Sequence, residues 1–332
     1  MAKKILEVNN LTVGFPREDG LLKATDRVSF SIEEGQTLCV VGESGSGKSV
    51  TSLAIMRLID YAGGIVAGGE IRFDGEELTK KRQSEMNRIR GERMAMIFQD
   101  PMSALNPVFS VGEQIAESLR THKGMNKKDA WKRAVELLKL VGIPEAEIRA
   151  KQYPFEMSGG MCQRVVISMA LACEPELIIA DEPTTALDVT IQAQILDLLR
   201  RLKREHKTAT LLITHDMGVA AEMADRIAVM YAGAIVEEGT VDDIFNTPRH
   251  PYTVGLLRSI PRIEEEPGKE LYTIQGSIPG IGEIPKGCRF NNRCPHTTER
   301  CLNEEPPLLA AKANEGHRAA CWLDGIPEVA AR

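Results

Sequence analysis

Residues 42–49 read Gly42-Glu43-Ser44-Gly45-Ser46-Gly47-Lys48-Ser49 and match the phosphate-binding template G-x-x-x-x-G-K-[ST] at every fixed position. Glycines let the backbone of such a loop curl, so that successive N–H groups point inward at phosphate oxygens. The lysine then reaches the β- and γ-phosphates, and the serine hydroxyl is a ligand for Mg²⁺. The segment therefore predicts a loop that binds the phosphates of a nucleotide.

The residues on either side supply the structural context that this template requires. A short β-prone run, residues 36–41, precedes the loop, and residues 50–58 can continue it as a helix. Such a helix presents its positive N-terminal end to the anion. Strand, loop and helix agree, so a chance match in a Gly/Ser-rich turn is disfavoured.

Length and composition narrow the class of protein. The 332 residues suggest about two domains, and the formal net charge of -6 argues against a free-standing nucleic-acid-binding protein. No stretch approaches the ~18 apolar residues of a membrane span. Met1-Ala2-Lys3-Lys4 is followed by Ile5-Leu6-Glu7-Val8 and not by the apolar core of a signal peptide. We therefore expect a cytosolic chain whose cysteines are reduced or metal-bound.

Apolar runs and helical periods alternate along most of the chain. Strands are expected over residues 5–15, 28–32, 36–41, 70–75, 94–98, 177–180 and 210–213, and helices over 50–58, 163–172 and 192–204. Residues 111–141 carry a helical apolar period, and glycine pairs at 63–64 and 68–69 bracket a loop. This alternation predicts an α/β core with a mostly parallel sheet. From about residue 250 the chain is rich in proline, glycine and charge, which predicts a small appended region.

A pair of acids follows the apolar run Leu177-Ile178-Ile179-Ala180. Asp181, at the carboxyl end of a buried strand, can hold Mg²⁺ through its water shell. Glu182 can polarise the water that attacks the γ-phosphate. Two acids after an apolar run are by themselves more often a solvated strand end, but beside an intact phosphate loop they indicate nucleotide hydrolysis.

Further motifs in a fixed order make residues 5–260 resemble the ABC transporter ATPases. The resemblance rests on the signature segment Ser158-Gly159-Gly160-Met161-Cys162-Gln163-Arg164, the glutamine-loop residue Gln99, the acidic and aspartate-loop segment 181–188, the switch histidine His215 and the aromatic Phe15. It implies a P-loop ATPase core with a mostly parallel sheet, an antiparallel β-subdomain and a helical signature subdomain at about residues 100–170. Residues 1–250 would form the ATPase domain, and residues 251–332 a small Cys-rich extension.

The resemblance also implies a role for each motif residue. ATP is expected to be bound by Phe15, through adenine stacking, and by Gly42, Ser44, Gly45, Ser46, Gly47, Lys48, Ser49 and Val50. Ser158, Gly159 and Gly160 would bind the ATP held by a partner subunit, with Asp188 at the seam of that dimer. Mg²⁺ would be held through Ser49, Gln99 and Asp181. Glu182 would be the general base, assisted by His215 and Gln99.

One signature position departs from the family pattern. Met161 stands where glutamine is commoner, and a thioether cannot donate the hydrogen bonds of an amide. The serine and both glycines of the signature remain, so its phosphate-binding part is expected to work. Gln99, His215 and Phe15 would each, taken alone, more often be structural residues, but their position and order favour the functional roles. We therefore expect ATP hydrolysis and not only nucleotide binding.

Segments 42–58, 99–107 and 249–253 look like the dipeptide/oligopeptide importer branch, most closely the first of two paired ATPase subunits in bacterial dipeptide importers. This implies a peripheral subunit on the cytoplasmic face of the inner membrane that powers peptide uptake. Its partners would be a second, paralogous ATPase subunit in a heterodimer, two membrane permeases and an extracytoplasmic solute-binding protein, with no nucleic acid. Met102, Leu105 and Val108 are candidate permease contacts.

Two other functions stay open. A weakly hydrolysing regulatory or structural subunit would carry the same motifs, and importers of glutathione, nickel chelates or haem use similar ATPases. An ABC ATPase that acts on DNA or ribosomes is disfavoured, because the chain has one cassette and no long coiled-coil insert between the phosphate loop and the acidic strand end.

Four cysteines, Cys288, Cys294, Cys301 and Cys321, lie in the appended region with spacings C-x5-C, C-x6-C and C-x19-C. Thiolates in a loop-rich cytosolic segment indicate a site for zinc or an iron–sulfur cluster. Tight C-x2–4-C zinc knuckles are missing, and the family resemblance points to a [4Fe-4S] cluster. Zinc, free thiols and disulfides remain alternatives. His296 and His317 could substitute as ligands, but they are expected to be solvated. Cys39, Cys162 and Cys173 are expected to lie in the core.

Overall fold

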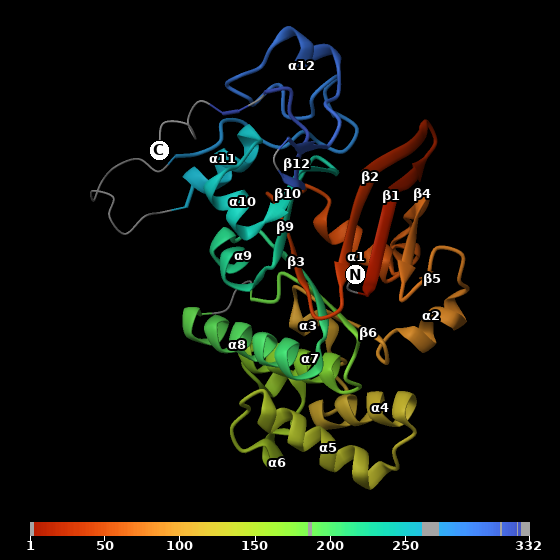
Figure 1. Ribbon diagram of the computed structural model, residues 1–332. Coiled ribbons are helices and arrows are strands. Elements are labelled where there is room, and N and C mark those ends of the chain that lie inside the picture. Colours follow the sequence, from red (N-terminus) through yellow and green to blue (C-terminus); the bar gives the residue numbers. More distant parts are fainter. Residues whose placement is uncertain (1–2, 185–187, 261–271, 313, 324, 327–332) are drawn as a thin grey trace. The chain divides into compact units, whose positions relative to one another are not determined.

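The computed structural model describes residues 3–184, 188–260, 272–312, 314–323 and 325–326 (Figure 1). The chain forms two compact units, each assembled from separated segments. Unit 1 comprises residues 1–6, 32–36 and 72–213, and unit 2 comprises residues 7–31, 37–71 and 214–332. Both units combine strands with helices, which confirms the predicted α/β class.

Unit 1 is built around three parallel strands in the order β8-β7-β6. Its elements are β5 (Glu76–Glu77), α2 (Gln83–Ile89), β6 (Met94–Ile97), α3 (Pro101–Ala104), α4 (Val111–Lys123), α5 (Lys127–Leu140), α6 (Ala146–Arg149), α7 (Gly159–Leu171), β7 (Leu177–Asp181), α8 (Val189–His206) and β8 (Ala209–Thr214). Every residue of β7 is buried, as expected for a central parallel strand that is covered on both faces. The predicted strands at 94–98, 177–180 and 210–213 are thus confirmed.

The helical period over residues 111–141 is carried by two helices and not by one. Gly124 ends α4 in the left-handed conformation, and the Asn126 side chain caps α5 by accepting a hydrogen bond from the Asp129 N–H. Helices α4 and α5 pack against each other and against α7 (Figure 1). The signature helix α7 is therefore held by a helical layer within unit 1.

Unit 2 contains the strand order β11-β12-β10-β9-β3, in which β3 and β9 are parallel and the remaining pairs antiparallel. Strands β2, β1 and β4 lie side by side in a separate sheet. The elements are β1 (Lys4–Arg17), β2 (Gly20–Glu33), β3 (Thr37–Val41), α1 (Lys48–Ile55), a 3-10 turn (Ile59–Ala62), β4 (Ile65–Phe73), α9 (Met217–Met223), β9 (Arg226–Tyr231), β10 (Ala234–Thr240), α10 (Val241–Asn246), α11 (Pro251–Arg258), α12 (Glu299–Asn303), β11 (Leu309–Ala311) and β12 (Asn314–Ala319).

The loop predicted around the glycine pairs at 63–64 and 68–69 is wrong in its second half. Gly68 and Gly69 lie within strand β4. A Cβ on Gly69 would stand 2.4 Å from the carbonyl oxygens of Asn9 and Asn10, and its φ is +81°. Glycine is therefore required here for close approach of two strands, and it does not mark a loop.

The appended region extends the sheet of unit 2. Strand β12 pairs antiparallel with β10, with Glu237 opposite Ala319 and Glu238 opposite Arg318. Phe290 packs edge-on against Tyr231, with ring centroids 5.2 Å apart, and also contacts Tyr252. Backbone pairing and an aromatic cluster thus join the Cys-rich segment to the core of this unit.

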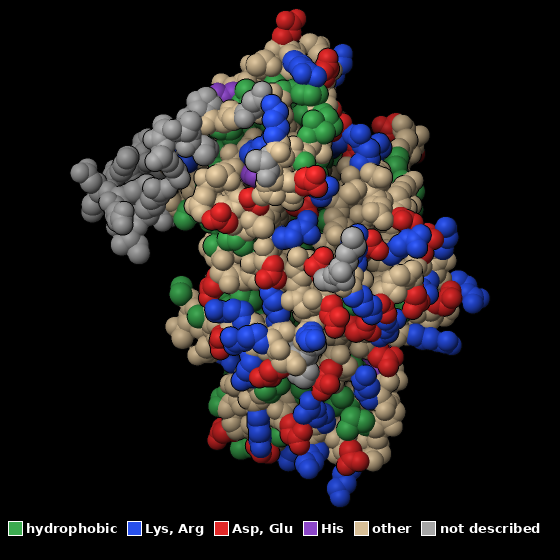
Figure 2. Space-filling model, viewed as in Figure 1, with side chains coloured by type: hydrophobic (Ala, Val, Ile, Leu, Met, Phe, Trp, Pro, Cys, Tyr) green, Lys and Arg blue, Asp and Glu red, His purple; other side chains and the backbone are tan. Residues whose placement is uncertain are grey.

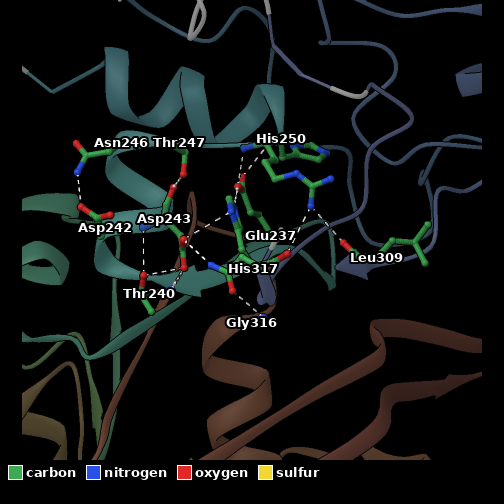
Figure 3. A network of polar contacts seen from close by, with 12 residues as sticks. Glu237, Thr240, Asp242, Asp243, Asn246, Thr247, His250, Leu309, Gly316 and His317 are labelled. Carbon is green, nitrogen blue, oxygen red and sulfur yellow. Dashed lines mark hydrogen bonds and ion pairs between the residues drawn. The ribbon is translucent and has the colours of Figure 1, made fainter. Parts of the chain in front are cut away.

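A polar network centred on Glu237 of β10 also holds strand β12 in place (Figure 3). Glu237 is fully buried, and its carboxylate accepts hydrogen bonds from the backbone N–H groups of Arg249 and His250, at 2.6 and 3.0 Å. The His317 ring lies 2.8 Å from the same carboxylate. Both carboxylate oxygens thus have hydrogen-bond partners, which is the condition under which a buried polar group is tolerated. His317 was predicted to be solvated, and that prediction is wrong.

Candidate functional site

The phosphate loop follows strand β3, as the sequence predicts, and is curled by three glycines. Gly42, Gly45 and Gly47 have φ values of +155°, +84° and +101°, which only glycine adopts freely. A Cβ on Gly42 would stand 2.2 Å from the Met230 carbonyl oxygen on the neighbouring strand β9. Gly47 then caps helix α1. The loop is therefore pressed against the sheet in a conformation that fits an anion at the start of α1.

The side chains of this loop are arranged for phosphate binding. Lys48 is 5% exposed, and its ammonium group donates to the carbonyl oxygens of Gly42 and Glu43 at 2.8 and 2.9 Å. Ser46 Oγ is buried and has no hydrogen-bond partner among the described residues. Ser49 and Val50 lie in the first turn of α1. A buried cation at a curled loop and helix start fits the phosphates of a nucleotide.

Two further residues of the predicted ATP site, Phe15 and His215, belong to unit 2 but lie outside the loop. Phe15 is half-buried near the end of β1, and its ring edge packs beside Gly64. His215 is exposed between β8 and α9. Next to it, the Asp216 side chain caps α9 by accepting from the Gly218 N–H at 2.7 Å. The cap fixes the backbone on which His215 is presented.

Unit 1 brings together two of the predicted catalytic residues at the end of strand β7. Asp181 ends the strand and is 5% exposed. Glu182 follows it with φ of +46°, a conformation that costs a non-glycine residue on the order of 1 kcal/mol or more. The Glu182 N–H donates to the Ile213 carbonyl at 2.9 Å, and Gln99 Nε2 donates to the Glu182 carboxylate at 3.0 Å. The glutamine loop and the acidic strand end therefore meet in the folded chain.

The signature segment opens helix α7 with an exposed serine. Ser158 caps the helix, and its hydroxyl accepts a hydrogen bond from the Met161 N–H at 3.3 Å. Ser158 and Gly159 face solvent at the positive end of the helix. Asp188 caps α8 by accepting from the Ile191 N–H, while Thr185, Ala186 and Leu187 of the aspartate loop lie outside the described residues.

One contact in this region was not anticipated from the sequence. Gln163 is buried in α7, and its amide donates to the carbonyl oxygen of Pro183 at 2.8 Å. Pro183 directly follows Glu182, so this bond connects the signature helix to the acidic strand end. A glutamine within a mostly apolar helix was the signal that the sequence offered.

The candidate permease contacts divide into exposed and buried side chains. Met102 is exposed and Val108 is 70% exposed, and the neighbouring Phe109 is exposed as well. Leu105, by contrast, is buried and belongs to the core of unit 1, so its predicted contact role is wrong.

Acidic and basic side chains intermingle on the face of the molecule shown in Figure 2. No helix in the described ranges is long and apolar enough to cross a membrane.

The four cysteines of the appended region line one cavity of about 20 Å³, together with His250 and His296. Burial, reinforced by the other three cysteines, raises the pKa of Cys288 to about 11. Within the ranges that the structure describes, however, no three His, Cys, Asp or Glu side chains come close enough to hold a metal ion. Such a cavity has room for about one water and is smaller than an eight-atom cluster requires. Cys39, Cys162 and Cys173 are core residues, as predicted.

Comparison with known proteins places these features in a family context. A family model described as "ABC transporter" matches residues 25–185, and one described as "Oligopeptide/dipeptide transporter, C-terminal region" matches residues 236–301. The chain is 52% identical to the oligopeptide transport ATP-binding protein AppD of Bacillus subtilis, over 96% of each chain. It is 50% identical to OppD of Salmonella typhimurium, over 97% of this chain and 94% of that one.

A third relative and a solved structure agree with these matches. The dipeptide transport ATP-binding protein DppD of Haemophilus influenzae is 52% identical over 92% of each chain. The dimeric, post-hydrolysis structure of the ATP-binding cassette MJ0796, bound to ADP and phosphate, superimposes with a TM-score of 0.65 at 30% identity. That superposition covers 71% of this chain and 99% of the cassette.

Proposed function

The chain belongs to the ATP-binding proteins of oligopeptide and dipeptide ABC transporters, and from this we propose that it hydrolyses ATP to drive the import of di- and oligopeptides. The observation that carries the hydrolytic role is the hydrogen bond from Gln99 to Glu182, directly after a buried strand that ends in Asp181. A carboxylate held in this way is a suitable general base. No observation favours the alternative of a weakly hydrolysing regulatory subunit.

Each motif residue has a separate task in this proposal. Phe15 stacks on adenine, and the loop residues Gly42, Ser44, Gly45, Ser46, Gly47, Lys48, Ser49 and Val50 bind the phosphates. Ser49, Gln99 and Asp181 hold Mg²⁺, which when bound neutralises phosphate charge. Glu182 accepts a proton from the attacking water, and His215 contacts the γ-phosphate and steadies Glu182.

The partners follow from the same family membership. Ser158, Gly159 and Gly160 are proposed to bind the ATP of a second, paralogous ATPase subunit, with Asp188 at the seam of the heterodimer. Support for a dimer comes from the dimeric form of the similar cassette MJ0796. Two membrane permeases and an extracytoplasmic solute-binding protein complete the importer. The exposed side chains of Met102, Val108 and Phe109 suit a permease contact on the cytoplasmic face of the inner membrane.

Uptake of labelled peptides by intact cells tests the transport role. A strain that lacks this chain should lose uptake of labelled di- and oligopeptides, and the wild-type chain should restore it. Lys48→Ala should fail to restore uptake, whereas Lys151→Ala, at an exposed position, should succeed. Unchanged peptide uptake in the deletion strain, with loss of glutathione, haem or nickel-chelate uptake instead, would overturn the peptide assignment.

For the appended region we propose a metal centre, of the [4Fe-4S] type that the family resemblance implies. Its support is the convergence of Cys288, Cys294, Cys301 and Cys321 on one cavity. The cavity as it stands does not fit a cluster, so binding requires the thiols to leave these positions. Anaerobic purification should yield about four irons and four sulfides per chain, lost in Cys288→Ala and retained in Cys173→Ala. Stoichiometric zinc, or no metal, would contradict the proposal.

A further inference from the structure

Arg293 of the Cys-rich segment forms an ion pair with the phosphate loop. Its guanidinium donates to both carboxylate oxygens of Glu43, at 2.7 and 3.1 Å. The Arg293 side chain is 4% exposed, whereas the Glu43 side chain is 33% exposed. Both residues belong to unit 2 although 250 positions separate them. A bidentate pair of this kind is oriented as well as strong.

The same guanidinium also holds the chain segment that precedes the cysteines. Arg293 donates to the backbone carbonyls of Gln275 at 2.9 Å and of Ile274 and Gly276 at 3.3 Å. Two residues further on, Ile278 lies beside the loop, since a Cβ on Gly45 would be 3.8 Å from its side chain. Arg293 therefore fastens residues 274–278 alongside the phosphate loop.

Glu43 is fixed in its backbone by other groups. Its N–H donates to the hydroxyl of Tyr252 at 2.9 Å, and its carbonyl accepts from the Lys48 ammonium. Tyr252 is fully buried and packs against Tyr231, with ring centroids 4.7 Å apart. The carboxylate of Glu43, in contrast, has Arg293 as its cationic partner in this arrangement. The core thus sets the path of the loop backbone, and Arg293 of the appended region holds the Glu43 carboxylate.

A carboxylate in a phosphate-binding loop opposes the binding of a triphosphate. Like charges in the same site repel, and we expect an uncompensated carboxylate at this position to weaken ATP binding about tenfold. We propose that Arg293 is a positioning residue for the ATPase reaction, which compensates and orients Glu43 and so makes ATP affinity depend on the appended region. The proposal rests on the ATP-binding function proposed above.

Equilibrium binding of MgATP to the full-length chain tests this role. Arg293→Gln should weaken binding about tenfold, because Glu43 is left uncompensated. Adding Glu43→Gln to that variant should restore the affinity to within about threefold of wild type, because the uncompensated charge is then gone. Arg300→Gln is the matched control, since Arg300 lies in the same region but is exposed, pairs with Glu304 and stacks on Trp322.

Each result is decisive. Wild-type ATP affinity in Arg293→Gln would overturn the proposal. A double variant that binds ATP as weakly as Arg293→Gln alone would also overturn it, because that result would indicate a purely structural role for Arg293. If Arg293→Gln does not fold, Arg293→Lys can be measured instead. This variant keeps the positive charge but loses the planar guanidinium that donates to both carboxylate oxygens. Its ATP affinity should be below that of wild type, but by less than tenfold. Absence of ATP binding by the wild-type chain would instead refute the proposed function.

Discussion

Glu182 combines two features that mark functional residues. Its backbone lies in a region that non-glycine residues rarely adopt, and its carboxylate is held by an amide from a distant segment, Gln99. Strained positions persist where the surrounding structure over-determines them, and they cluster at active sites. The sequence predicted both residues from motif order, but the φ angle and the hydrogen bond depend on how β6, β7 and β8 align and were not predictable locally.

The phosphate loop permits a direct prediction for a single side chain. Lys48→Ala removes the buried ammonium group of the loop and should weaken MgATP binding to the full-length chain about 10- to 100-fold, the range expected for charged hydrogen bonds. Fluorescence or calorimetric titration measures this. Lys151→Ala should bind like wild type, and a Lys48→Ala affinity within twofold of wild type would contradict the assignment of the loop.

At the scale of elements, strand β4 contains a glycine pair, Gly68 and Gly69, where the sequence predicted a loop. The local pattern predicted a loop, because glycine usually interrupts strands. The positive φ of Gly69 and its approach to Asn9 and Asn10 on β1 are tertiary requirements that leave no periodic signal. Strand β7, in contrast, was predicted correctly, since four consecutive apolar residues bounded by an acid need only the local pattern.

Gly69→Ala should therefore destabilise the protein by about 2 kcal/mol or more, because the added methyl group meets two carbonyl oxygens at 2.4 Å. Gly75→Ala is the matched control, with a similar φ of +79° but nothing within 4 Å of the added Cβ. It should cost about 1 kcal/mol. Urea unfolding measures both, and equal losses of stability would show that steric contact at Gly69 plays no part.

Strand β10 supports a second prediction at this scale. Glu237→Ala leaves His317 and two backbone N–H groups without their buried acceptor, at a cost of about 3–5 kcal/mol (Figure 3). Thermal or urea unfolding should show a large loss of stability. Glu315→Ala, at an exposed position of β12, should stay within about 0.5 kcal/mol of wild type. Similar stabilities for both variants would indicate that the network does not fasten β12.

At the scale of the whole molecule, the chain passes repeatedly between its two units, and the extension that looked appended contributes strands to a core sheet. The domain boundary proposed at residue 250 stays a prediction. The ladder between β10 and β12 joins residues on both sides of that position. Pairing between positions about 80 apart has no local signature, so β12 could not be predicted from the sequence. The alternation of strands and helices was sufficient for the α/β class.

ATP turnover in the assembled importer, with Glu182→Gln in this subunit alone, tests whether this chain itself hydrolyses ATP for transport. We expect turnover to fall about 100-fold or more with ATP binding retained, because the general base is removed and the phosphate loop is intact. Glu147→Gln, at an exposed helical position, should leave turnover unchanged. Undiminished turnover in Glu182→Gln would show that the partner subunit carries out the hydrolysis.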